Sequence, residues 1–107
     1  FRREPSEENI QAVTACRVWV ISYDALQFLF HSMPEFREFG RMMLILGNLS
    51  LKDRIVSMIR HTAEERYAAL LKAKPDVFQH VPLKMIASYL GITDTSLSRI
   101  RREVAQK

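Results

Sequence analysis

The segment that decides the fold is residues 86–103, which read IASYLGITDTSLSRIRRE. Two short helical patterns meet there at Gly91. In the first pattern, apolar residues recur at the i, i+3, i+4 and i+7 spacing of a helix that buries one face; they are Leu83, Ile86, Ala87 and Leu90. Pro82 suits the start of this helix because the first turn does not need its missing N–H. The sequence therefore predicts a helix over residues 82–90.

Gly91 and its neighbours predict a tight turn into a second helix. Glycine readily adopts the left-handed conformation that ends a helix. Ile92 is apolar and can fill the space between two crossing helices, and Ala87 is small where such helices approach each other. Thr93 can accept a hydrogen bond from a free N–H of the next helix. Together these residues predict a helix-turn-helix.

The second helix has an apolar side and a polar side. Leu97, Ile100 and Val104 share one side and are predicted to pack inward. The opposite side has hydroxyl, guanidinium and amide groups, which can bond to base edges and phosphates in a major groove; they belong to Thr95, Ser98, Arg99, Arg102 and Gln106. Residues 82–107 hold five basic and two acidic side chains, a net charge of +3 out of the chain's +4. The simpler alternative is a solvated face on a helical hairpin, but the turn pattern favours DNA binding.

A long helix is predicted upstream, from Pro34 to about Arg60. No proline interrupts it, and its apolar residues recur at spacings of three and four. It would be about 26 residues, or about 40 Å, long. The apolar band is too wide for one contact, so we expect a two-fold homodimer through this helix. The residues expected in or near the dimer seam are Met42, Ile45, Leu49, Val56 and Ile59. A simple core helix is the alternative.

The remaining elements are shorter. Thr62 and Glu65 match a capping box for a helix that stops before Pro75. Ser6 and Asp24 are candidate N-caps of two further helices, the second of which runs to about residue 32. Residues 13–22, VTACRVWVIS, are rich in β-branched and aromatic types and predict a strand with Cys16 and Trp19 packed inside. A strand needs partners, so we expect part of a larger domain to lie upstream of residue 1.

Composition excludes several classes of protein. With 107 residues and 48% hydrophobic content, the chain can bury one modest core or two small ones. No apolar run reaches the roughly 18 residues of a membrane span, so we expect no membrane partner. The single cysteine cannot form an internal disulfide, which favours a reducing compartment, so we expect a cytoplasmic protein. Neither a catalytic triad nor metal-ligand spacing is present. We therefore expect no enzyme activity, no metal and no cofactor.

The segment 82–102 resembles the helix-turn-helix of the Crp/Fnr transcription regulators, in a Bacteroidetes-like subgroup. TACRVWVISYDAL, residues 14–26, resembles the last β-roll strand of that family, and the apolar stretch after Pro34 resembles its dimerisation helix. The resemblance implies a mainly α chain in three parts. Residues 1–33 would be the C-terminal remnant of a cyclic-nucleotide-binding-like β-roll, residues 34–60 the dimerisation helix, and residues 61–107 the helix-turn-helix domain.

The resemblance also implies function. It predicts a homodimeric regulator that binds an inverted repeat in double-stranded DNA and works with RNA polymerase. The predicted DNA-binding residues are Thr93, Asp94, Thr95, Ser96, Ser98, Arg99 and Arg102. Asp94 replaces a basic residue of the cyclic-AMP-responsive members, so their half-site preference does not transfer. The family's winged hairpin, which follows the recognition helix, is not among residues 1–107, so its phosphate contacts do not transfer.

A cyclic-nucleotide effector is not expected. The family's phosphate-binding arginine and serine correspond here to Ser6 and Glu7, and a carboxylate repels a phosphate. Its nucleotide-contacting hydroxyls correspond to Leu51 and Lys52, and neither residue has a hydroxyl group. Two alternatives to the DNA-binding function stay open. One is a protein-interaction module with the helix-turn-helix shape, and the other is a sensor that binds a non-nucleotide ligand in the absent β-roll.

Overall fold

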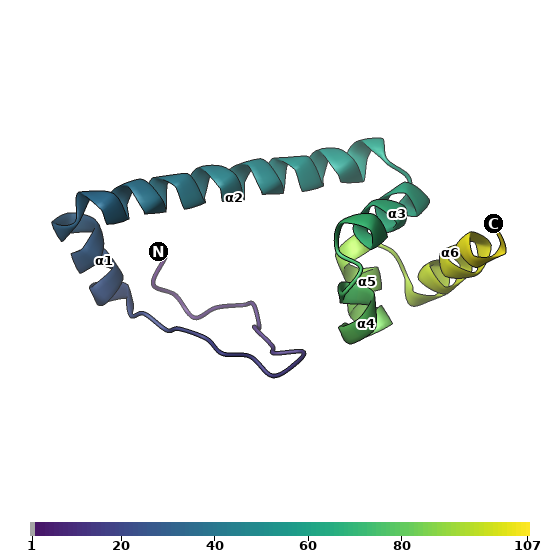
Figure 1. Cartoon of the computed structure of the whole chain (residues 1–107), viewed down its shortest axis with the longest axis horizontal. Helices are drawn as coiled ribbons and strands as arrows, with labels where there is room; N and C mark the ends of the chain where they lie inside the picture. The colour runs from purple at the N-terminus through teal and green to yellow at the C-terminus, as the bar shows by residue number, and fades with distance from the viewer. Residues whose placement is uncertain (1) are drawn as a thin grey trace. The chain divides into compact units, whose positions relative to one another are not determined.

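The computed structural model describes residues 2–107, and helices dominate them (Figure 1). The mainly α fold class is therefore confirmed. The helices of these residues are α1 (Tyr23–Ser32), α2 (Pro34–Arg60), α3 (Ala63–Ala73), α4 (Val77–His80), α5 (Leu83–Leu90) and α6 (Asp94–Gln106). The chain forms two compact units, the first ending at Lys52 and the second running over Asp53–Lys107. The boundary lies inside α2, so the last turns of α2 belong to the same unit as α3 to α6.

In the first unit, α1 turns sharply into the start of α2 (Figure 1). Ser22 is the N-cap of α1, because its hydroxyl accepts a bond from the Ala25 N–H at 3.2 Å. The assignment of Asp24 as the cap was therefore wrong, and Asp24 lies in the first turn, where its charge still suits the helix dipole. The rings of Phe30 and Phe36 lie 5.3 Å apart, centre to centre, and join the two helices.

The long helix α2 is confirmed, and it begins at Pro34 as predicted. Within the first unit, residues 41–52 of α2 are exposed in the single chain. They include seven large apolar side chains with 40% to 72% of their surface accessible, namely Met42, Met43, Leu44, Ile45, Leu46, Leu49 and Leu51, and Phe39, just before them, is 58% accessible. This helix therefore presents apolar surface to water on several sides.

The predicted strand over residues 13–22 was wrong, since no strand occurs in residues 2–107. A strand needs a neighbour for its backbone N–H and C=O groups, and no segment of the described chain lies beside it in that way. Cys16 and Trp19 were expected to be packed, but both are exposed, and Trp19 is 96% accessible. The helix start at Ser6 was also wrong. The Ser6 hydroxyl instead accepts a bond from the Glu8 N–H at 3.0 Å and closes a local turn.

The second unit has a small apolar core where α5 packs against both α3 and α6 (Figure 1). The buried residues are Tyr67, Ile86, Ala87, Leu90, Leu97 and Ile100. Tyr67 meets Phe78 of α4 edge-on, with 5.3 Å between ring centres. Leu83 and Val104 were expected to pack inward but are 39% and 41% exposed, because they lie at the outer ends of α5 and α6, beyond the core.

The N-terminus of α3 has the predicted capping box. The Glu65 N–H donates to the Thr62 hydroxyl oxygen at 3.2 Å, and the Thr62 N–H donates to the Glu65 carboxylate at 2.8 Å. Two backbone donors that a helix start leaves free are thus both satisfied. This fixes the position at which the chain leaves α2 and enters α3.

Candidate nucleic-acid interface

The turn between α5 and α6 is fixed by backbone hydrogen bonds. Gly91 has φ 71° and ψ 32°, the left-handed conformation that was predicted for it. Its N–H donates to the Ser88 carbonyl at 3.1 Å, and the Ile92 N–H donates to the Ala87 carbonyl at 3.0 Å. This pair of bonds is the Schellman arrangement of helix ends. Only three residues then separate α5 from α6.

Thr93 caps α6 as predicted. Its hydroxyl oxygen accepts a bond from the Ser96 N–H at 3.1 Å, and its O–H donates to Ser96 Oγ at 2.9 Å. Both hydroxyls are thus occupied with each other, and Ser96 is partly buried. Of the predicted contact residues, these two therefore fix the start of α6, while their exposed neighbours Asp94 and Thr95 face water.

Two buried side chains decide which side of α6 faces outward. Leu97 and Ile100 are 1% and 0% exposed and anchor the helix to the core. The side of α6 away from them is exposed in the chain, and its residues are Thr95, Ser98, Arg99, Arg102 and Gln106. The structure therefore brings the predicted polar residues together on one accessible side, formed by successive turns of a single helix.

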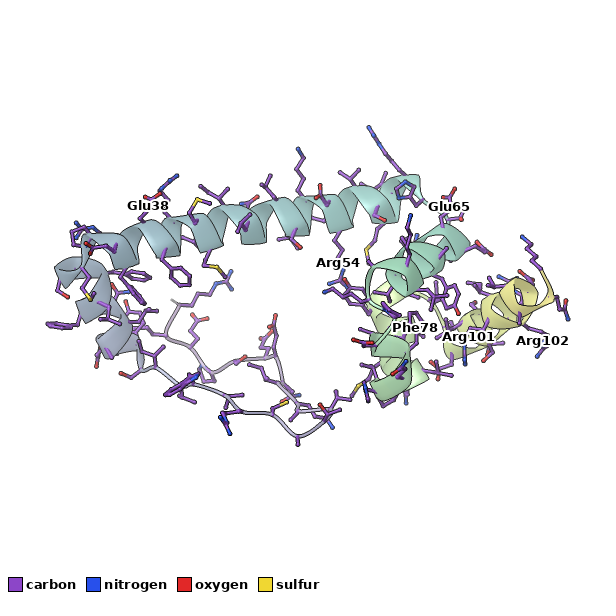
Figure 2. All side chains as sticks on the ribbon, viewed as in Figure 1. Glu38, Arg54, Glu65, Phe78, Arg101 and Arg102 are labelled. Carbon is purple, nitrogen blue, oxygen red and sulfur yellow. The ribbon has the colours of Figure 1, made fainter. Side chains whose placement is uncertain are left out.

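Two residues of α6 were missed as members of this surface. Glu103 lies one turn after Arg99, with 3.9 Å between its carboxylate and Arg99 Nε, and both side chains are more than half exposed. The i, i+4 spacing in the sequence signals this pair. Arg101 is exposed too, but it lies about 100° around α6 from Arg102, at the edge of the polar side (Figure 2). A partner of the polar side therefore meets Arg99 and Arg102, with the exposed carboxylates of Asp94 and Glu103 nearby.

The charge of the chain is concentrated in the unit that contains α6. Residues 53–107 hold ten lysines and arginines against six aspartates and glutamates, a net charge of +4. Residues 1–52 hold six of each and are neutral overall. The whole net positive charge thus belongs to the second unit, which favours a polyanionic partner for it.

The residues predicted for the dimer seam are accessible to different degrees. Met42, Ile45 and Leu49 are 43%, 40% and 50% exposed in the first unit. In the second unit Ile59 is 78% exposed and Val56 is partly buried. All five lie on α2, and four of them offer large apolar surface in the single chain.

The described residues contain neither a metal-binding cluster nor a helix that could span a membrane. The histidine, cysteine, aspartate and glutamate side chains of residues 2–107 form no group of three or more that could hold a metal ion. None of the helices in the same residues combines the length and the apolar character that crossing a membrane requires.

The chain matches none of the protein-family models, curated proteins or solved structures with which it was compared. The second unit thus combines a capped, core-anchored helix that has an exposed polar side with all of the net charge of the chain.

Proposed function

We propose that the chain is part of a sequence-specific transcription regulator that binds double-stranded DNA as a homodimer. The observation that supports this most is the exposed polar side of α6, which the buried Leu97 and Ile100 turn toward water. An α-helix with its side chains is about 10–12 Å across, and the major groove is about 12 Å wide. The α6 helix is thus narrow enough to enter that groove, and its exposed side has groups that can bond to DNA there.

The residues of α6 are suited to different parts of DNA. Arg99 lies in the second turn of α6, where a recognition helix meets base edges, and its guanidinium suits the two acceptors of guanine. Arg102 lies about one turn later, where a helix in the groove passes the phosphates. The N-terminal turn, capped by Thr93, offers free N–H groups to a phosphate.

The apolar surface of α2 is the basis for the proposed homodimer. Met42, Ile45 and Leu49 follow spacings of three and four, and Val56 and Ile59 continue the series after one polar position, Lys52. That spacing is the seam pattern of paired helices. Exposed apolar surface of this extent marks an interface, and a second copy offers the matching stripe through two-fold symmetry.

The resemblance to Crp/Fnr regulators extends the proposal to the rest of the protein. Residues 1–33 are assigned to the C-terminal end of a cyclic-nucleotide-binding-like β-roll. The helix pair α5–α6 is assigned as the helix-turn-helix. RNA polymerase is a proposed partner and the cytoplasm the proposed location. We propose no catalytic activity, no cofactor and no cyclic-nucleotide effector.

Salt-dependent binding to duplex DNA tests the proposal. The chain is titrated with a random-sequence duplex at several salt concentrations, and the logarithm of affinity is plotted against the logarithm of salt concentration. A DNA-binding surface gives a linear fall whose slope reports the number of phosphates neutralised. The charge-matched variants Arg102→Ala on α6 and Lys72→Ala on α3 are compared, and only the first is expected to reduce the slope. Undetectable duplex binding at low salt would overturn the proposal.

A protein-interaction module is the second candidate, and one feature favours it. A groove of about 240 Å³ lies among α3, α4 and α5, lined by Leu70, Lys74, Val77, Val81, Met85, Ile86 and Tyr89. Its walls are mostly apolar, as in a groove that takes a peptide side chain. The same salt titration decides between the two candidates, because an apolar groove gives no affinity for random duplex DNA.

A further inference from the structure

The C-terminal end of α5 has an unusually complete set of hydrogen bonds. The last four carbonyls of an α-helix have no partner within the helix and ordinarily bond to water or to a cap. In α5 they belong to residues 87–90. The turn itself serves the first two, because the Ile92 N–H donates to the Ala87 carbonyl and the Gly91 N–H donates to the Ser88 carbonyl.

Two arginines from other helices serve the remaining carbonyls. Arg54 of α2 donates from Nη2 to the Tyr89 carbonyl at 3.1 Å, and Arg66 of α3 donates from Nη2 to the Leu90 carbonyl at 3.0 Å. The guanidinium carbon of Arg54 also lies 4.2 Å from the centre of the Tyr89 ring. Figure 2 shows Arg54 extending from α2 on the side of the shorter helices. All four terminal carbonyls of α5 are thus bonded within the second unit.

The same two arginines tie this helix end to the end of α2. Arg66 donates from Nη1 to the carbonyl of His61, the residue that follows α2, at 2.7 Å. Its guanidinium therefore bridges the residue after α2 and the end of α5. Cations at a helix C-terminus also interact favourably with the helix dipole. The bond to the Tyr89 carbonyl is exposed, and water could replace it, so the bond from Arg54 does more than satisfy a carbonyl: it links α2 to the end of α5.

We infer that Arg54 and Arg66 are positioning residues that set the direction in which α6 leaves the turn. This inference rests on the proposed DNA-binding function. The chain has three residues between Leu90 and the start of α6, so any tilt of the end of α5 is passed on to α6. Over the roughly 20 Å length of a 13-residue helix, a tilt of about 10° moves the far end by about 3 Å. At Arg102, about 12 Å along the helix, the displacement is about 2 Å, which is enough to break a hydrogen bond to a phosphate.

The consequence concerns the spacing of DNA half-sites. In a homodimer joined through α2, the bonds from Arg54 and Arg66 determine how far apart and at what angle the two copies of α6 stand. A rigid connection makes the dimer prefer one half-site spacing, whereas a loosened connection accepts several. Arg54 and Arg66 therefore determine the preference for one half-site spacing, although neither contacts a base.

The test uses the 107-residue chain, the best inverted repeat selected from random duplexes, and the same repeat lengthened by one base pair between the half-sites. Arg54→Ala is the main variant, because Arg54 is exposed and its loss leaves no buried cavity. Its affinity for the best repeat is expected to fall by about tenfold, whereas affinity for the lengthened repeat changes less than about twofold. Arg54→Lys, which keeps a charged donor over the Tyr89 ring, is expected to recover part of the spacing preference.

Lys72→Ala on α3 is the matched control for the loss of one positive charge. Lys72 is exposed, and within residues 2–107 its side chain makes no hydrogen bond or ion pair. This variant is expected to leave the ratio of the affinities for the two repeats unchanged. An unchanged ratio in Arg54→Ala would overturn the inference, because any loss of affinity would then be an effect of charge alone.

Amide hydrogen exchange at Gly91 and Ile92 supplies a readout without DNA. If Arg54 holds the turn, exchange of these two amides is expected to accelerate by at least about tenfold in Arg54→Ala and to stay within about twofold of wild type in Lys72→Ala. Unchanged exchange in Arg54→Ala would overturn the inference. Absence of duplex binding by the wild-type chain would overturn the proposed function instead, and the exchange measurement would still decide whether the arginines hold the turn.

Discussion

At the scale of single residues, Gly91 shows how one backbone angle determines a turn. A Cβ at this position would meet only Met58 Cε, at an ordinary contact distance of 3.6 Å. Space is therefore available, and the requirement for glycine comes from its φ of 71°. Gly91→Ala is expected to lower the free energy of unfolding by about 1–2 kcal/mol, and Gly91→Asn by less. Chemical denaturation followed by circular dichroism measures both, and equal stability of the alanine variant and wild type would contradict this account.

Glu38 and Arg41 form an exposed ion pair on the first turns of α2. Arg41 Nε donates to the Glu38 carboxylate at 2.9 Å, and its Nη2 bonds the other carboxylate oxygen. These hydrogen bonds, with a smaller contribution from the charge of Arg41, hold the pKa of Glu38 below its usual value. Figure 2 marks the position of Glu38 near the start of α2.

The lowered pKa of Glu38 predicts a pH dependence of definite sign. The ionised carboxylate is favoured in the folded chain, so the pair stabilises the fold above the unfolded pKa of glutamate and stops doing so as pH falls through the lower folded value. Arg41→Ala is expected to return the pKa of Glu38 toward its ordinary value. An NMR titration of the Glu38 side-chain carboxyl measures the change, and an unaltered pKa in the variant would show that the hydrogen bonds are not its cause.

Removal of Arg99 and removal of Arg102 are expected to weaken DNA binding in different ways. Arg99→Ala should cost about 1–3 kcal/mol on the selected site and relax the preference for one base pair. Arg102→Ala should weaken selected and scrambled duplexes alike and reduce the salt slope by about one unit. Salt titrations of both variants on both duplexes separate these effects. If Arg99→Ala leaves the ratio of the two affinities unchanged, its assignment to a base edge is wrong.

Local chemistry explains which residues could be assigned from the sequence. The roles of Thr62, Gly91 and Thr93 depend on hydrogen bonds within three to five residues of the chain, so a short pattern contains all the partners. Arg54 was missed because its partner, the Tyr89 carbonyl, lies 35 residues away, and no local pattern signals such a contact.

At the scale of secondary-structure elements, residues 13–22 show the limit of propensity. Their β-branched and aromatic side chains favour a strand, but strand propensity measures fit to a pleated and partly buried surface. Without a neighbouring strand, the apolar side chains of this segment are exposed, including Val18, Trp19 and Val20. The helices could be predicted because an α-helix satisfies its own backbone, whereas the strand depends on residues that the sequence pattern does not include.

The apolar stripe of α2 gives a test of self-association. Leu49→Lys places a charge in the proposed seam, whereas Leu51→Lys makes the same change about 160° away around the helix. Both leucines are at least half exposed in the single chain, so neither change disrupts its fold. Because each copy loses a leucine that the dimer would bury, Leu49→Lys is expected to weaken the dimer by at least about 100-fold.

Sedimentation equilibrium over a range of chain concentrations measures this dimer constant. Leu51→Lys, the control variant, is expected to leave it within about threefold of wild type. Equal weakening by both substitutions would indicate non-specific association of an apolar helix. A wild-type chain that remains monomeric at high concentration would contradict the seam altogether.

At the scale of the whole molecule, charge and apolar surface belong to different units. The first unit is neutral and exposes most of the apolar surface of α2, whereas the second unit has all of the net charge and the polar side of α6. A chain divided in this way is suited to self-association through one part and polyanion binding through the other. The proposed regulator requires both properties together.

Selection of bound sequences from a pool of random duplexes tests the central claim most directly. The wild-type chain is incubated with the pool at moderate salt, and bound duplexes are recovered, amplified and sequenced over several rounds. A homodimer with one recognition helix per copy is expected to enrich an inverted repeat whose half-site centres lie about one helical turn, roughly 34–36 Å, apart. Enrichment of a single half-site, of direct repeats, or of no sequence at all would contradict the account.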